Sequence, residues 1–131
     1  MLKAVLIAVS VMSVNAFADE YFHTPSGNIY CQGANDGVTC YIMDKTNTAI
    51  VSRPNDCDLD WGNLFYLEAP RGRAELVCHG DALDLADTKK LAYGKTIKGK
   101  GWQCTSQKTG LTCKNSQGHG FTLSRKKQTL F

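Results

Sequence analysis

The sequence has little net charge and few apolar runs. Its formal net charge is +3 over 131 residues, and this falls to +2 when Lys3 is left out. A chain so close to neutral gives no indication of a protein that binds nucleic acid or an anionic membrane surface. Beyond residue 18 no apolar run reaches the roughly 20 residues that span a bilayer. We therefore expect no nucleic-acid partner and no membrane insertion of the mature chain.

The first 18 residues have the pattern of a secretory signal peptide. Met1-Leu2-Lys3 is a short basic start, Ala4 to Val14 is almost wholly apolar, and Ala16-Phe17-Ala18 is a small-x-small cleavage pattern. We predict cleavage after Ala18, which leaves residues 19–131 as a single disulfide-rich β domain. The predicted location is periplasmic or secreted.

Several motifs of catalysis and metal binding are also missing. The chain has no G-x-S-x-G nucleophile elbow and no C-x2-4-C pair of the kind that binds zinc. The three histidines, His23, His79 and His119, follow no known ligand spacing. The sequence therefore predicts neither a metal site nor a cofactor.

The cysteines are more informative. Six of them lie in the predicted mature chain, and an even number in a small exported chain is typical of a disulfide framework. They are Cys31, Cys40, Cys57, Cys78, Cys104 and Cys113.

Two cysteine segments are near copies of each other, 73 residues apart. Cys31–Cys40 reads CQGANDGVTC, and Cys104–Cys113 reads CTSQKTGLTC. If each is a hairpin with a four-residue loop, Ala34–Gly37 and Gln107–Gly110 are those loops, and a glycine stands where we expect a positive φ. The two cysteines of each hairpin then lie opposite each other, within disulfide reach. The predicted bridges are Cys31–Cys40, Cys104–Cys113 and, by elimination, Cys57–Cys78.

Side-chain alternation gives each hairpin one apolar face. Ile29, Val38 and Ile42 join the first cysteine pair, and Trp102 and Leu111 join the second. Two such faces can cover each other. Further strands are predicted at 63–69, 73–79, 94–104 (interrupted at 99–101) and 119–125, with a loop or one helical turn at 81–92. The predicted fold is all-β, a small disulfide-stapled antiparallel sandwich or barrel built from hairpins with little or no helix.

An acidic segment precedes the 63–69 strand. Asp56-x-Asp58-x-Asp60 is similar to the opening of a calcium-binding loop, which needs Gly at its sixth position and Glu at its twelfth. Trp61 and Leu67 stand there instead, so we interpret the segment as a polar turn. Trp61 itself is a candidate binding residue, because exposed aromatic side chains anchor interfaces.

His119 is the one candidate for catalysis. It lies between two glycines, and a histidine titrates near neutral pH. A general base also needs a nucleophile and an orienting partner, for which only Ser116 and Ser124 are near in sequence. Arg125 could contact an anion. We favour a turn or bulge with His119 packed on a neighbouring strand, and we keep His119 and Arg125 as candidate binding residues.

Six segments of the mature chain together resemble a family of small exported bacterial proteins of unknown function. They are Phe22–Cys31 (FHTPSGNIYC), Cys57–Gly62 (CDLDWG), Cys78–Asp81 (CHGD), Leu91–Gly94 (LAYG), Gly110–Asn115 (GLTCKN) and Gly118–Arg125 (GHGFTLSR). The resemblance implies an exported six-cysteine domain and supplies no catalytic residues.

Our leading hypothesis is a non-enzymatic exported binding protein. Its partner would be another exported or envelope protein, for which it could act as an inhibitor or an immunity-like partner. The alternative is a small periplasmic hydrolase that uses His119, with Arg125 stabilising an anion. A structural component of the envelope is a third possibility.

Overall fold

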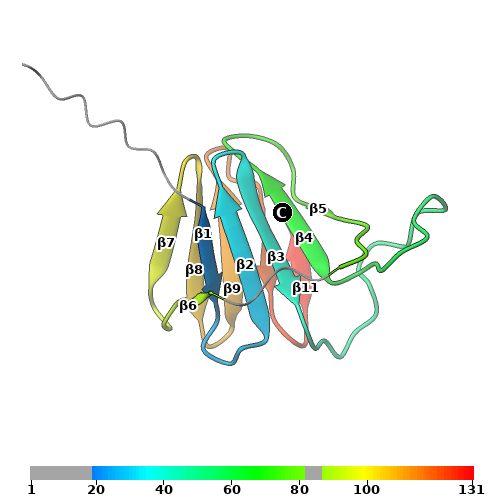
Figure 1. Cartoon of the computed structure of the whole chain (residues 1–131), viewed down its shortest axis with the longest axis horizontal. Coiled ribbons are helices and arrows are strands. Elements are labelled where there is room, and N and C mark those ends of the chain that lie inside the picture. Colours follow the sequence, from blue (N-terminus) through cyan, green and yellow to red (C-terminus); the bar gives the residue numbers. More distant parts are fainter. Residues whose placement is uncertain (1–18, 82–86) are drawn as a thin grey trace, which may run out of the picture.

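Two β-sheets pack face to face (Figure 1). The computed structural model describes residues 19–81 and 87–131, so the predicted signal peptide at residues 1–18 lies outside the described residues. Within these two ranges the chain is all-β and contains no helix. Accordingly, no helix in this part of the chain could cross a membrane.

The strands of each sheet follow one another along the chain. The first sheet has the order β5-β4-β3-β2-β1-β6, in which β6 pairs parallel to β1, and the second has the order β11-β10-β9-β8-β7. The strands are β1 Glu20–His23, β2 Ile29–Ala34, β3 Gly37–Ile42, β4 Leu64–Glu68, β5 Glu75–Leu76, β6 Lys89–Lys90, β7 Thr96–Gly99, β8 Trp102–Gln107, β9 Gly110–Asn115, β10 Gly120–Leu123 and β11 Gln128–Leu130.

The near-identical segments form the central hairpin of each sheet. Cys31 pairs with Cys40 and Cys104 with Cys113 in register, and each pair is a disulfide with a Cα–Cα distance of 4.1 Å. Each hairpin loop has two residues in place of the predicted four, because the paired strands continue one residue further on each side of the turn. Gly37 and Gly110 have φ values of 155° and 142°. Each lies so near a carbonyl oxygen of the next strand that a Cβ would overlap it.

The repeat extends beyond the hairpins to all five strands of each half. Phenylalanine stands opposite the second cysteine in both sheets, as Phe65 beside Cys40 and Phe121 beside Cys113. A leucine on the following strand then stands opposite each phenylalanine. The meander β1–β5 is therefore repeated as β7–β11 with matching register.

Equivalent residues of the two halves meet in the core. The Cys40 and Cys113 sulfurs lie 4.0 Å apart, and the Phe65 and Phe121 rings are 5.8 Å apart. All four side chains are fully buried. The predicted disulfide-stapled sandwich is confirmed, and its two apolar hairpin faces cover each other.

Three predicted strands differ from the structure. The 94–104 segment is a hairpin of β7 and β8, because Gly101 turns the chain at a φ of 77°. The 73–79 strand shortens to β5, because Cys78 is bonded to Cys57 and His79 pairs with Asp60. The 119–125 strand shortens to β10, because Ser124 forms a turn with Lys127.

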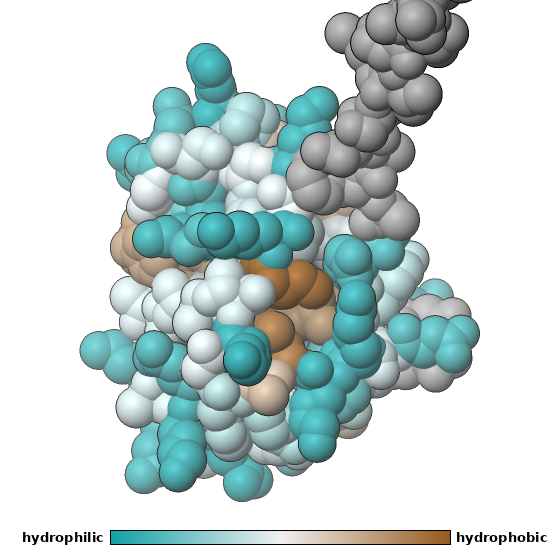
Figure 2. Space-filling model, turned by 90° about the vertical axis from the view of Figure 1, so that its left-hand side faces the viewer, coloured by the Kyte–Doolittle hydropathy of each residue, from teal (hydrophilic) through white to brown (hydrophobic). Residues whose placement is uncertain are grey.

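On one side of the sandwich, the edge strands β6 and β7 and the residues that flank β7 carry many lysines. Figure 2 shows this side, where apolar side chains reach the surface between hydrophilic ones. Charged side chains on an edge strand discourage pairing with another chain. The exposed lysines are Lys89, Lys90, Lys95, Lys98 and Lys100.

Trp102 closes one end of the sandwich. Its indole Nε1 donates to the Ala34 carbonyl at 2.8 Å, and its ring lies over Gly33 and Gly99. A Cβ on either glycine would overlap the ring. The tryptophan therefore needs glycine both on β7, the adjacent strand of its own sheet, and on β2 of the facing sheet.

We expect Gly33→Ala to destabilise the protein by about 1–3 kcal/mol, because the added methyl group forces Trp102 from its place. The measurement is the free energy of unfolding from urea titration. Gly80→Ala is the matched control, since a Cβ there meets its nearest atom at 3.6 Å without steric conflict. Equal stability of the two variants would contradict the packing described for Trp102.

Candidate functional site

The connection between β3 and β4 is the most prominent feature outside the sheets. It extends away from the sandwich on the right-hand side of Figure 1. We call its central part, residues 50–61, the pinned loop. Because a single connection projects so far, it presents its backbone and side chains to other molecules.

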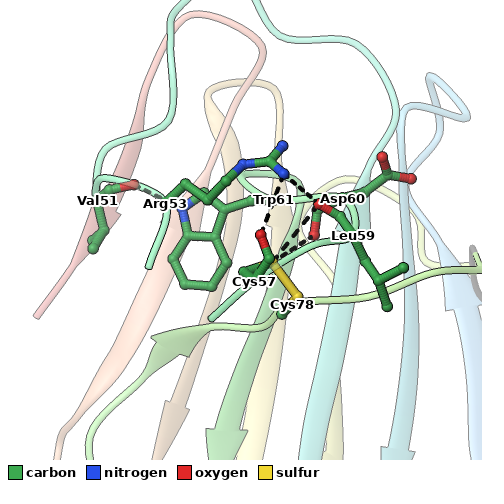
Figure 3. Close-up of a disulfide and its surroundings, with 7 residues drawn as sticks. All are labelled: Val51, Arg53, Cys57, Leu59, Asp60, Trp61 and Cys78. Atoms are coloured by element: carbon green, nitrogen blue, oxygen red, sulfur yellow. Dashed lines mark hydrogen bonds between the residues drawn. A yellow bond between two sulfur atoms is a disulfide. The ribbon is translucent and has the colours of Figure 1, made fainter. Parts of the chain in front are cut away.

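A disulfide, drawn in Figure 3, and a short backbone bridge attach the base of the pinned loop to the sandwich. Cys57 is bonded to Cys78, with a Cα–Cα distance of 5.8 Å. Asp60 and His79 exchange two backbone hydrogen bonds of 2.8 and 3.1 Å. The loop is therefore tied at two successive points to the segment that follows β5.

Side chains of the loop satisfy its own backbone. The Arg53 guanidinium donates to the Leu59 carbonyl at 2.7 Å and, at 3.5 Å, to that of Cys57. The Trp61 indole donates to the Val51 carbonyl at 2.8 Å. These bonds cross the loop from one side to the other, as Figure 3 shows. A loop of this length thereby holds a defined shape without regular secondary structure.

The outer surface of the pinned loop combines apolar and acidic side chains. Ile50, Val51 and Leu59 are 40%, 43% and 55% exposed. The exposed carboxylates Asp56, Asp58 and Asp60 form no ion pair in the described parts of the chain. Apolar groups on a fixed backbone bind a partner with little loss of conformational entropy.

The structure separates the three predicted binding residues. Trp61 belongs to the pinned loop, where it is partly buried and packs against the core. His119 precedes β10, and its backbone N–H donates to Asn115 Oδ1 at 3.2 Å. Arg125 follows the other end of β10 and is exposed. His119 and Arg125 therefore lie at opposite ends of one strand, so they do not form a common site.

The chemistry around His119 and the acidic segment is limited. Ser116 Oγ donates to the Gly101 carbonyl and Ser124 Oγ to that of Lys127, and no hydrogen bond between His119 and either serine is found. Across residues 19–81 and 87–131, no three His, Cys, Asp or Glu side chains are arranged to hold a metal ion.

In the part of the chain that the structure describes, Tyr66 is the one group with a clearly displaced pKa. Burial raises the pKa of its phenol, and the nearby carboxylates of Asp36, Glu68 and Glu75 raise it further. The phenol donates a hydrogen bond of 3.2 Å to the Asp36 carbonyl. It therefore stays protonated at neutral pH and acts as a hydrogen-bond donor.

The sequence indicated Trp61 but missed its neighbours. Ile50, Val51 and Leu59 follow no strand or helix periodicity, and Arg53 bonds only carbonyl groups. The sequence nonetheless contained a signal of their exposure. Apolar residues in a segment without strand or helix periodicity do not share one buried face, so they are expected at the surface.

The fold and the loop define a class of protein, the small disulfide-stapled β-sandwich with a projecting loop that is held by a disulfide. Three disulfides of this kind indicate an oxidising compartment. The chain belongs to a family of unknown function (DUF6636), whose model matches residues 1–131. Comparisons with curated proteins and with solved structures gave no match.

Proposed function

We propose that this protein is an exported, non-enzymatic binding protein that uses the pinned loop to contact another exported or envelope protein. The observation that carries the proposal is the exposure of Ile50, Val51 and Leu59 on a covalently fixed backbone. A rigid loop of this kind suits an inhibitor or an immunity-like partner. Export to the periplasm or the medium follows from the signal-peptide pattern of residues 1–18.

The charge of the loop defines the chemistry of the partner. The loop carries three exposed aspartates beside its apolar side chains in sequence, and its one arginine, Arg53, is bonded to loop carbonyls. The complementary surface is an apolar socket with a basic rim. Opposite charges around such a contact accelerate association, and salt weakens the attraction.

We expect the double substitution Ile50→Ser and Leu59→Ser to weaken partner binding at least tenfold, since truncation of an apolar anchor typically costs more than 1 kcal/mol. Protein purified with its disulfides formed is used to capture partners from envelope extract. Affinity for the captured partner is then measured by surface plasmon resonance at two salt concentrations.

Two variants provide controls for this experiment. Phe131→Ser removes a comparable exposed apolar side chain, 46% exposed, from the C-terminus. His119→Ala removes the candidate catalytic group. Both should bind like the wild type. If the double substitution binds normally, or if His119→Ala abolishes the biological phenotype, the proposal fails.

A further inference from the structure

The end of the sandwich opposite Trp102 is open and contains a groove of about 420 Å³. One wall is the β1–β2 turn, residues 24–29, and another is the β8–β9 turn, from Gln107 to Gly110. The segments that follow β3 and β10 complete it, with Tyr93 at its rim. The groove thus joins segments from both halves of the chain. Its volume lies within the roughly 300–1,000 Å³ of small-molecule sites.

The repeat explains why this end is open. Ile29 of β2 occupies the position that Trp102 occupies in β8, because both lie two residues before the first cysteine of their hairpin. The glycine under Trp102 on β2, Gly33, corresponds to Ser106 on β8 by the same offset. At this end the smaller isoleucine replaces the indole that fills the other end.

The walls of the groove are held in place by hydrogen bonds between separate segments. Asn28 Nδ2 donates to the Asp44 carbonyl at 2.9 Å, and the Asp44 N–H donates to Asn28 Oδ1 at 2.8 Å. The Met43 N–H donates to the Asn28 carbonyl at 2.8 Å. Near Tyr93, the Gly94 N–H donates to the Ser106 carbonyl at 2.7 Å. A site fixed in advance binds its ligand with less ordering cost.

The lining combines apolar side chains with an excess of positive charge. Ile29 and Leu123 are buried, whereas Met43 and Tyr93 are 49% and 44% exposed. Lys108 and Arg125 supply two cations against the single carboxylate of Asp44. The one ion pair recorded among residues 19–81 and 87–131 joins Lys89 to Glu20, so both groove cations lack a carboxylate partner there.

We propose that this groove binds a small organic anion with an apolar body. A carboxylate would lie between Lys108 and Arg125, and an aromatic or alkyl body would contact Ile29, Met43 and Tyr93. Charge-assisted hydrogen bonds to a guanidinium are among the stronger contacts of this kind. This site is separate from the pinned loop, so the inference goes beyond the proposed function.

The probe pair is 3-phenylpropionate and its neutral amide, titrated into ¹⁵N-labelled protein with its disulfides formed. We expect the acid to shift the amide signals of the groove residues, and the neutral amide to bind about tenfold more weakly. The Arg125→Gln substitution should weaken binding of the acid by about the same factor. This variant keeps the backbone bond from the Thr46 N–H to the Arg125 carbonyl, 2.9 Å.

Lys114→Gln is the matched control, because Lys114 lies near Trp102 at the closed end. It should bind the acid like the wild type, and so should the Leu59→Ser loop variant. Equal affinity for acid and amide, normal binding by Arg125→Gln, or shifts outside the groove would overturn the proposal. Since the loop variant tests the other surface, failure of one proposal is distinguishable from failure of the other.

Discussion

Replacing the four hairpin cysteines with alanine should leave the protein unfolded at about 37 °C. In the loop-entropy account, a disulfide that closes a loop of about ten residues contributes about 2.7 kcal/mol to the free energy of unfolding. The two hairpin disulfides together then contribute roughly 5 kcal/mol. That equals the whole stability of many small domains, about 5–15 kcal/mol. The four side chains are also at most 1% exposed and touch one another through Cys40 and Cys113, so their loss leaves cavities in the core.

The measurement is thermal and urea unfolding followed by circular dichroism. The variant should show no cooperative transition, and the Cys57→Ser, Cys78→Ser variant should keep one. That control removes the outer bridge, whose Cys78 is partly exposed, and leaves the sandwich core intact. A cooperative transition near that of the wild type in the four-alanine variant would show that apolar packing alone holds the sheets together.

The Cys57→Ser, Cys78→Ser variant should instead lose partner binding, by about a hundredfold. Without the bridge the pinned loop gains conformational freedom, and fixing each residue on binding costs about 1–2 kcal/mol. Ordering two or three residues accounts for the factor, since tenfold corresponds to about 1.4 kcal/mol. Affinity for the captured partner and amide exchange of residues 50–61 are measured on the same sample.

Faster exchange in the loop together with weaker binding is the expected pair of results. The strands β2, β3, β8 and β9 should keep their protection, because their own disulfides are unchanged. If the loop exchanges faster and the affinity stays the same, rigidity of the loop plays no part in recognition. If the loop stays protected, the Arg53 and Trp61 hydrogen bonds fix it without the bridge.

The hairpin register was predictable from the sequence because it depends on side-chain parity. Parity places Cys31 and Cys40 on one face only in alternate registers, and among these the directly opposed register brings them within disulfide reach; the copied segment obeys the same rule. The edges were less predictable. β6 has only two residues and pairs with β1, which is distant in the chain, and β11 is a three-residue strand beside β10.

The binding surfaces were predictable only in part, since each depends on contacts made after folding. Trp61 stood out by its residue type, but the loop shape follows from Arg53 reaching two carbonyls across the turn. The groove residues are spread from Thr24 to Arg125. Ile29 and Trp102 occupy equivalent positions in the two halves, but no local sequence pattern shows that the tryptophan fills its end of the sandwich while the isoleucine leaves a groove at the other.

The most direct test of the central claim is photo-crosslinking from inside the pinned loop. A photoreactive phenylalanine analogue is placed at position 59 in one variant and at position 129, exposed on β11, in another. In producing cells, irradiation should link position 59 to a specific exported protein and leave position 129 without that adduct. The same adduct from position 129, or none from position 59, would contradict a role for the loop in recognition.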